Sequence, residues 1–199
     1  MNCSDDAEIE RQLLGLFDFE RQRFLGKKLK PFTLDRVQAA LERLGHPEKQ
    51  FQVIHIAGTK GKGSTALMLQ HLMIEHTGRR TGLFTSPHLV SLRERIRIDG
   101  ESIDLQRMKQ LLTGLLELNS EYFGGDLTFF EILFLCSLLH FRDGKIPWAI
   151  LETGLGGRLD ATNALDSVAL SVLTRMGLDH QEILGNSLEE ITREKAGIM

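Results

Sequence analysis

The chain has 199 residues, of which 42% are hydrophobic and 26% are charged, and its formal net charge is -3. This composition is typical of a globular protein with one core, and the small negative charge gives no general attraction to nucleic acid or anionic membranes. No apolar run is long enough to span a bilayer. The polar, acidic start and the presence of only two cysteines, Cys3 and Cys136, indicate the reducing cytoplasm.

The first third of the chain predicts two helices, a strand and a third helix. Apolar residues at helical spacing run from Glu8 to Leu25, and a basic connector, Lys27–Lys30, follows. Thr33 can cap a helix that extends to Leu44 and stops at Gly45. A strand is predicted at Gln52–Ala57, and a helix follows from about Gly63 to Thr77.

The rest of the chain alternates short apolar runs with helical patterns, which favours an α/β fold with a mostly parallel sheet and flanking helices. Cys136 lies in an apolar helical run, so we expect it to be a buried small hydrophobe. The predicted strands are Thr81–Thr85, a hairpin around Asp99-Gly100, and two inner strands, Pro147–Leu151 and Val168–Leu173. The predicted helices are Leu105–Leu118, a buried one at Phe129–Phe141, and one opened by the capping box Ser187–Glu190.

The segment between the first predicted strand and the helix after it is rich in glycine and contains a lysine. Gly58, Gly61 and Gly63 allow backbone N–H groups to surround phosphate oxygens, and Lys62 and the helix N-terminus add positive charge. The Walker pattern requires a hydroxyl directly after the lysine, whereas here Ser64 is displaced by one residue. The alternative is an ordinary glycine-rich turn.

Four polar segments follow four apolar runs: the loop after Ala57, Thr85–His88, Glu152–Asn163 and Thr174–His180. Parallel sheets place their ligands at such strand ends. Glu152 ends one of these runs, and a carboxylate there requires a partner, which is either Mg²⁺ or Arg158. His180 alone is equally a loop histidine or a ligand, Ser86 alone is an ordinary Ser-Pro turn opener, and Lys195 alone is an ordinary helix lysine.

Taken together and in this order, six segments resemble the folylpolyglutamate synthase/dihydrofolate synthase family of the Mur ligase superfamily. The most specific of them is Glu152–Asn163, which muramyl ligases lack. The six segments are Gly58–Ser64, Thr85–Leu89, Arg93–Arg97, Glu152–Asn163, Leu178–Gln181 and Glu194–Ile198.

The resemblance implies a P-loop NTPase-like Mur ligase central domain that uses ATP to join a pteroate or folate carboxylate to the amine of L-glutamate through an acyl phosphate. Two Mg²⁺ ions are implied, with ATP as co-substrate and dihydropteroate or a reduced folate as substrate. No nucleic-acid or membrane partner is implied, and we expect the full-length protein to be a monomer.

The resemblance also implies roles for individual residues. Lys62, Glu152, His180 and Lys195 would be catalytic, and Lys195 corresponds to a lysine that becomes a carbamate by reaction with CO2. The implied ATP contacts are Lys60, Gly61, Lys62, Gly63 and Ser64, and the implied metal ligands are Ser86, Glu152, His180 and Lys195. The implied pterin contacts are Thr128, Phe129, Phe130, Glu131, Leu159, Asp160, Ala161, Leu34, Asp35 and Arg36.

Three features depart from the family pattern: two residue differences and the absence of the family's C-terminal domain. Lys60 stands where Asn is frequent, and Phe129-Phe130 stands where Tyr-Phe is common. The segment Thr128–Glu131 can also be a plain helix start. We expect residues 1–199 to be an incomplete N-terminal ATP-binding domain, inactive alone, because a C-terminal glutamate-ligase domain is absent. The alternative functions are another Mur-type amino-acid ligase and a non-catalytic nucleotide-binding fragment.

Overall fold

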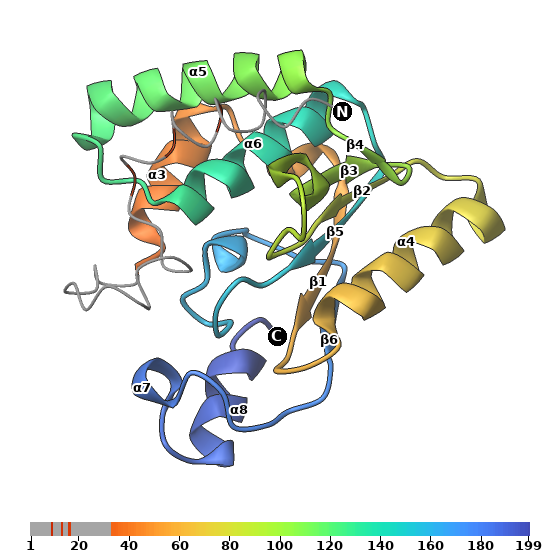
Figure 1. Cartoon of the computed structure of the whole chain (residues 1–199), viewed down its shortest axis with the longest axis vertical. Helices are drawn as coiled ribbons and strands as arrows, with labels where there is room; N and C mark the ends of the chain where they lie inside the picture. The colour runs from red at the N-terminus through yellow and green to blue at the C-terminus, as the bar shows by residue number, and fades with distance from the viewer. Residues whose placement is uncertain (1–8, 10–12, 14–15, 17–32) are drawn as a thin grey trace.

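A six-stranded mixed sheet forms the centre of the molecule (Figure 1), in a computed structural model that describes residues 9, 13, 16 and 33–199. The strand order is β4-β3-β2-β5-β1-β6. Strands β2, β5, β1 and β6 run parallel to one another, and β3 and β4 add an antiparallel hairpin at one edge. The strands are β1 (Gln52–Ala57), β2 (Thr81–Phe84), β3 (Ile96–Ile98), β4 (Glu101–Ser102), β5 (Trp148–Glu152) and β6 (Leu170–Leu173).

Helices cover both faces of this sheet, as expected for parallel strands. One face packs against α4, and the other carries the larger hydrophobic core beneath α3, α5 and α6 (Figure 1). The helices are α3 (Asp35–Arg43), α4 (Lys62–Thr77), α5 (Leu105–Phe123), α6 (Phe129–Asp143), α7 (Gln181–Leu184) and α8 (Leu188–Ala196). Short 3-10 helices are η1 (Pro47–Gln50), η2 (Leu92–Arg95) and η3 (Ala161–Asn163).

Local sequence signals account for several element boundaries. Capping boxes begin α6 at Thr128 and α8 at Ser187, each with a glutamate at the third helical position. Gly78 ends α4 in the left-handed conformation. Asp99 and Gly100 both have positive φ, at 53° and 85°, which suits the tight turn between β3 and β4.

The predicted α/β fold with a mostly parallel sheet and flanking helices is confirmed, and most predicted elements lie within a few residues of their expected positions. Helix α5 runs on to Phe123, beyond the predicted end. Helix α3 has Leu34 as its N-cap, and the Thr33 hydroxyl accepts only the Asp35 N–H, at 3.2 Å. The predicted helix Glu8–Leu25, the connector Lys27–Lys30 and Cys3 lie outside the described residues, apart from Ile9, Leu13 and Leu16.

Among the described residues, the segment Val168–Leu173, predicted as an inner strand, lies at an edge of the sheet. Strand β6 lies at the edge of the described sheet and pairs only with β1, so its side chains are less buried and Leu170 is 51% exposed. A short apolar run alone does not fix the position of a strand in the sheet, because that position depends on pairing with distant segments.

Two further sequence expectations concern burial and membranes. Cys136 is a free thiol in the core, and burial raises its pKa to about 12, which confirms a small buried hydrophobe. Within the described part of the chain, no helix is both long and apolar enough to cross a membrane.

Candidate active site

The carboxyl ends of β1, β2, β5 and β6 meet at one edge of the sheet, and the polar segments that follow them are in contact. The N–H of Ser86, after β2, donates to Glu152 Oε2, at the end of β5, at 3.2 Å. After β1, the N–H groups of Thr59 and Lys60 donate to the carbonyl of Arg175, which follows β6, at 3.0 and 3.2 Å. The structure therefore brings the four predicted segments together.

The glycine-rich loop has a conformation that only glycine adopts readily. Gly58 has φ 153°, and a Cβ there would lie 1.9 Å from Thr174 Oγ1. Gly61 has φ 86° and precedes α4, which begins at Lys62 without a side-chain cap. An uncapped helix start after such a loop leaves N–H donors directed at whatever binds there, which suits an anionic phosphate.

Two lysines converge on one backbone carbonyl of this loop. The ammonium groups of Lys62 and Lys195 each donate to the Gly58 carbonyl at 3.1 Å, although the two lysines are on different helices, α4 and α8. Lys195 is only 3% exposed. Burial, reinforced by the charge of Lys62, lowers the pKa of Lys195 to about 8. Lys195 therefore lies at the glycine-rich loop and is not a solvated helix lysine.

Glu152 lies beside Lys62 and does not have the arginine partner that was the alternative. Its side chain is nearly buried, with a residue exposure of 3%, and Lys62 Nζ lies 4.0 Å from Oε1. Arg158 instead pairs with Glu194, at 2.9 Å, so the expected alternative Glu152–Arg158 pair is wrong. Burial raises the pKa of Glu152 to about 7, against the lowering effect of Lys62. A carboxylate held this way suits a further cation.

The predicted metal ligands remain a prediction as a set. Ser86 contacts Glu152 through its backbone, and Lys195 reaches the same loop. His180 precedes α7 in the left-handed conformation, and its Nε2 lies 3.6 Å from Asp179 Oδ2. In the described chain no three His, Cys, Asp or Glu side chains gather as a metal cluster. The predicted set contains only two side chains of those types, so that finding does not test it.

Segments from all three predicted pterin-contact regions meet beside α6. Arg36 of α3 donates to Glu131 Oε1 at 3.2 Å. Phe130 lies against Gly154, where a Cβ would be 2.6 Å from the ring. Asp160 accepts the N–H of Leu155, next to Gly154, at 2.8 Å. An aromatic face, a glycine and a carboxylate thus lie together.

The alternative interpretation of Thr128–Glu131 as a helix start also holds. The Thr128 hydroxyl accepts the Glu131 N–H at 3.2 Å, and Glu131 Oε2 accepts the Thr128 N–H at 2.6 Å. Both carboxylate oxygens of Glu131 therefore have protein partners. A fixed carboxylate at a helix start is compatible with ligand contact, so the predicted pterin contact of Glu131 stays a prediction.

Comparisons with known proteins agree with this geometry. No family model matches the chain. The dihydrofolate synthase/folylpolyglutamate synthase of Bacillus subtilis is 41% identical over 170 residues, which are 83% of this chain and 39% of that protein. The dihydrofolate synthetase of Saccharomyces cerevisiae is 40% identical over 168 residues, with the same coverage of 83% and 39%.

Solved structures give the same result. E. coli FolC in complex with ADP has a TM-score of 0.82 and 34% identity, covering 98% of this chain and 43% of that one. A bifunctional folylpolyglutamate synthase/dihydrofolate synthase with Mn, AMPPNP and L-glutamate bound has a TM-score of 0.76 and 37% identity. The match covers 85% of this chain and 41% of that one. The chain is a homologue of the folylpolyglutamate and dihydrofolate synthases. It spans 39% of the length of the two curated relatives named above.

Three buried polar residues were given no individual role in the sequence analysis, although Arg95 and Thr162 lie in segments that carry the resemblance. Arg95 is fully buried, donates from Nε to His88 Nδ1 at 2.9 Å, and lies 5.4 Å from the Phe129 ring centre. His55 and Thr162, also fully buried, bond to each other at 2.8 Å. The signal for His55 was available, because it is the one polar side chain in the apolar run Val53–Ala57.

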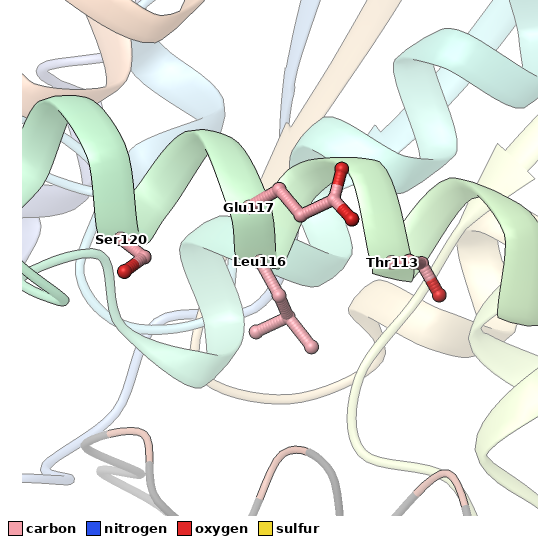
Figure 2. Close-up of a pocket in the computed structure, with 4 residues that line it drawn as sticks. All are labelled: Thr113, Leu116, Glu117 and Ser120. Carbon is pink, nitrogen blue, oxygen red and sulfur yellow. The ribbon is translucent and has the colours of Figure 1, made fainter.

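Two cavities among the described residues lie away from these segments. Figure 2 shows one of about 450 Å³ beside α5, lined by Thr113, Leu116, Glu117 and Ser120. None of these residues follows a strand. The other, of about 240 Å³, includes Glu48 and Gln52 at the opposite end of β1 and Ala169 just before β6. The candidate site is recognised from the contacts of its side chains.

His55 predicts a pH dependence of stability. Burial lowers its pKa from 6.5 to about 4, so the native state stays neutral while the unfolded chain takes up a proton below pH 6.5. The free energy of unfolding should therefore fall by about 3 kcal/mol between pH 6.5 and pH 4 and then level off for this group. Urea unfolding across this range checks it. A His55→Leu variant should lose this contribution, and an unchanged pH profile in that variant would contradict it.

Proposed function

We propose that this chain forms the ATP-binding and pterin-binding part of a ligase that joins L-glutamate to dihydropteroate, a reduced folate, or both. The observation that carries the proposal is the convergence of Lys62, Glu152 and Lys195 around the phosphate loop. The pterin-contact regions that meet at Phe130 support the substrate class. The similarity to synthases of this reaction supports the chemistry.

In the proposed reaction, a carboxylate oxygen of the pteroyl substrate attacks the γ-phosphorus of ATP, and ADP leaves. The glutamate amine then attacks the carbonyl carbon of the acyl phosphate, loses a proton, and phosphate leaves with the carboxylate oxygen. Backbone N–H groups of residues 60–64 and the Lys62 ammonium would hold the ATP phosphates. Phe130 would stack on the pterin, with Asp160, Arg36 and Glu131 fixing the walls around it.

The residues present fit a divalent cation. Glu152 is a desolvated carboxylate that pairs with Lys62 at 4.0 Å, and the more distant charge of Arg95 also acts on it. Ser86, Glu152, His180 and Lys195 would hold up to two Mg²⁺ ions, which supply positive charge to the transferring phosphate when bound. The lowered pKa of Lys195 leaves more of its amine neutral at neutral pH, as carbamate formation requires.

The proposal is tested by turnover of the complete product of the reading frame that contains this chain. ATP, L-glutamate and Mg²⁺ are supplied with either dihydropteroate or tetrahydrofolate, and ADP and the glutamylated product are measured. ADP formation that depends on one or both pterins supports the proposal. ATP turnover only with a cell-wall amino-acid precursor would indicate another Mur-type ligase, and nucleotide binding without turnover would indicate a non-catalytic module. We propose a monomer in the cytoplasm, consistent with the free buried thiol of Cys136.

Replacing Lys62 by Ala should weaken ATP binding by about tenfold to 100-fold, because the phosphate charge loses a fixed ammonium. Isothermal titration of ATP checks this. Lys49→Ala is the matched control, since Lys49 is half-exposed and pairs with Asp166 away from the loop. Equal ATP affinity in Lys62→Ala and the wild type would show that the glycine-rich segment is an ordinary turn without a role in ATP binding.

A further inference from the structure

A buried histidine lies directly beneath the candidate site and has no role in the proposed reaction. His55 is 0% exposed in the middle of β1, three residues before Gly58 of the phosphate loop. Its backbone neighbours across the sheet are Leu151 of β5 and Ser171 of β6. A buried imidazole in an apolar strand is unfavourable unless it is hydrogen-bonded, so its partner indicates its role.

A chain of hydrogen bonds connects His55 to the loop that follows β5. His55 Nε2 lies 2.8 Å from Thr162 Oγ1, which lies 2.5 Å from Asp160 Oδ1. Asp160 Oδ1 also accepts the Thr162 N–H at 3.0 Å, and Oδ2 accepts the Leu155 N–H at 2.8 Å. Both oxygens of this buried carboxylate are thus used within its own loop.

The directions of these bonds follow from the number of hydrogens. Burial raises the pKa of Asp160, whereas the backbone N–H groups and the Thr162 hydroxyl that it accepts lower the pKa and favour the ionised form. As a carboxylate, Asp160 accepts the single hydroxyl hydrogen of Thr162. The Thr162 oxygen must then accept from His55, which places the His55 proton on Nε2. Nδ1 keeps an unused lone pair, and the structure gives this buried atom no partner among the described residues. The opposite arrangement would leave a buried N–H without an acceptor, which is rarer and less favourable.

This chain of hydrogen bonds fixes the shape of the loop beside Phe130. Asp160 holds Leu155 at one end of the loop and Thr162 at the other. Gly154, adjacent to Leu155, lies so close to Phe130 that an added Cβ would be 2.6 Å from the ring. A small shift of Asp160 would therefore move the surface that faces Phe130.

We propose that His55 is a positioning residue for pterin binding: by donating from Nε2 to Thr162, it orients Asp160 and holds the loop from Gly154 to Ala161 in the shape that receives a flat heterocycle. The inference rests on the proposed function. His55 touches neither substrate in it and acts only through Thr162 and Asp160. We therefore expect the loss of the His55 hydrogen bond to weaken binding of the pterin substrate and to leave binding of ATP unchanged.

The test uses the complete gene product and measures KM for dihydropteroate, KM for ATP, and kcat. His55→Leu removes the donor and the unused lone pair, and Thr162→Val removes the hydroxyl at nearly constant shape. Each should raise the KM for dihydropteroate about tenfold while the KM for ATP stays within about twofold. The double variant should be no worse than the single ones, because both changes break one chain.

Two further variants separate positioning from general stability. His55→Gln can place an amide N–H near the position of Nε2, so its KM for dihydropteroate should return to within about threefold of the wild type. Ser137→Ala removes another fully buried hydroxyl, which donates to the Phe134 carbonyl at 2.6 Å on α6, and should change neither KM.

An unchanged KM for dihydropteroate in both His55→Leu and Thr162→Val would overturn the inference, as would equal rises for dihydropteroate and ATP. If His55→Leu fails to fold, Thr162→Val and His55→Gln decide by the same criteria. A wild-type protein without pterin-dependent turnover would contradict the proposed function itself. Turnover in the wild type without a selective effect in these variants contradicts only the role of His55.

Discussion

Glu152→Gln is expected to reduce ATP-dependent ligation by about 100-fold or more while leaving the fold intact, a loss of about 2.7 kcal/mol in transition-state stabilisation. The amide has nearly the same shape, but it lacks the charge that the proposed cation requires. Steady-state turnover of the complete gene product measures the effect. Glu117→Gln on the exposed side of α5 makes the same chemical change away from the site and should leave turnover unchanged.

The same variant should be at least as stable as the wild type when no metal is present. Burial raises the pKa of Glu152 from 4.5 to about 7, so the native state keeps its proton up to about pH 7 while the unfolded chain ionises above 4.5. Ionisation of Glu152 therefore destabilises the fold as pH rises from 4.5 through 7, and glutamine removes this loss.

Turnover of Glu152→Gln within about threefold of the wild type would contradict the metal role, since that is well under the 1.4 kcal/mol of a tenfold change.

Lys195→Ala is expected to lower turnover by about 1000-fold, because it removes the side chain that would become an anionic ligand facing the phosphate loop. The variant also removes the bond to the Gly58 carbonyl. A short carboxylic acid such as acetate, added at high concentration, should restore part of the activity by occupying the vacated position. Turnover against acetate concentration measures the restoration, and Lys145→Ala on the loop before β5 is the control.

The chemical state of Lys195 can be observed directly. Crystals of the complete protein grown with Mg²⁺ and bicarbonate should show a carbamate on Nζ. A bare ammonium on Lys195 in crystals whose enzyme is active in that same state would contradict the carbamate. An unmodified Lys195 in residues 1–199 alone does not contradict it, because the proposal concerns the complete protein.

The sequence was sufficient for features that depend on neighbouring residues. The bounds of β1, the buried helix α6 and the capping boxes at Thr128 and Ser187 all follow from periodicity and from residues within a few positions of each other. The convergence of strand ends also followed, because parallel strands share one carboxyl edge.

What could not be predicted depends on contacts between distant segments. Arg158 lies six residues after Glu152, yet it pairs with Glu194 because α8 packs against that loop, and its backbone N–H also donates to the Glu194 carbonyl. The meeting of Lys195 with Gly58 joins residues 137 positions apart, and His55 with Thr162 joins residues 107 apart. Such pairs are fixed by topology, which hydrophobic periodicity does not contain.

The measurement that tests the proposed ligation most directly is the fate of the substrate's carboxylate oxygen. Dihydropteroate labelled with ¹⁸O in its carboxylate is incubated with ATP, Mg²⁺, L-glutamate and the complete gene product, and the released phosphate is analysed by mass spectrometry. An acyl phosphate formed on that carboxylate must transfer one labelled oxygen to each phosphate, and the other stays in the new amide. We predict one ¹⁸O per phosphate released. Unlabelled phosphate would show that the ATP is cleaved by water, and it would contradict the proposed ligation.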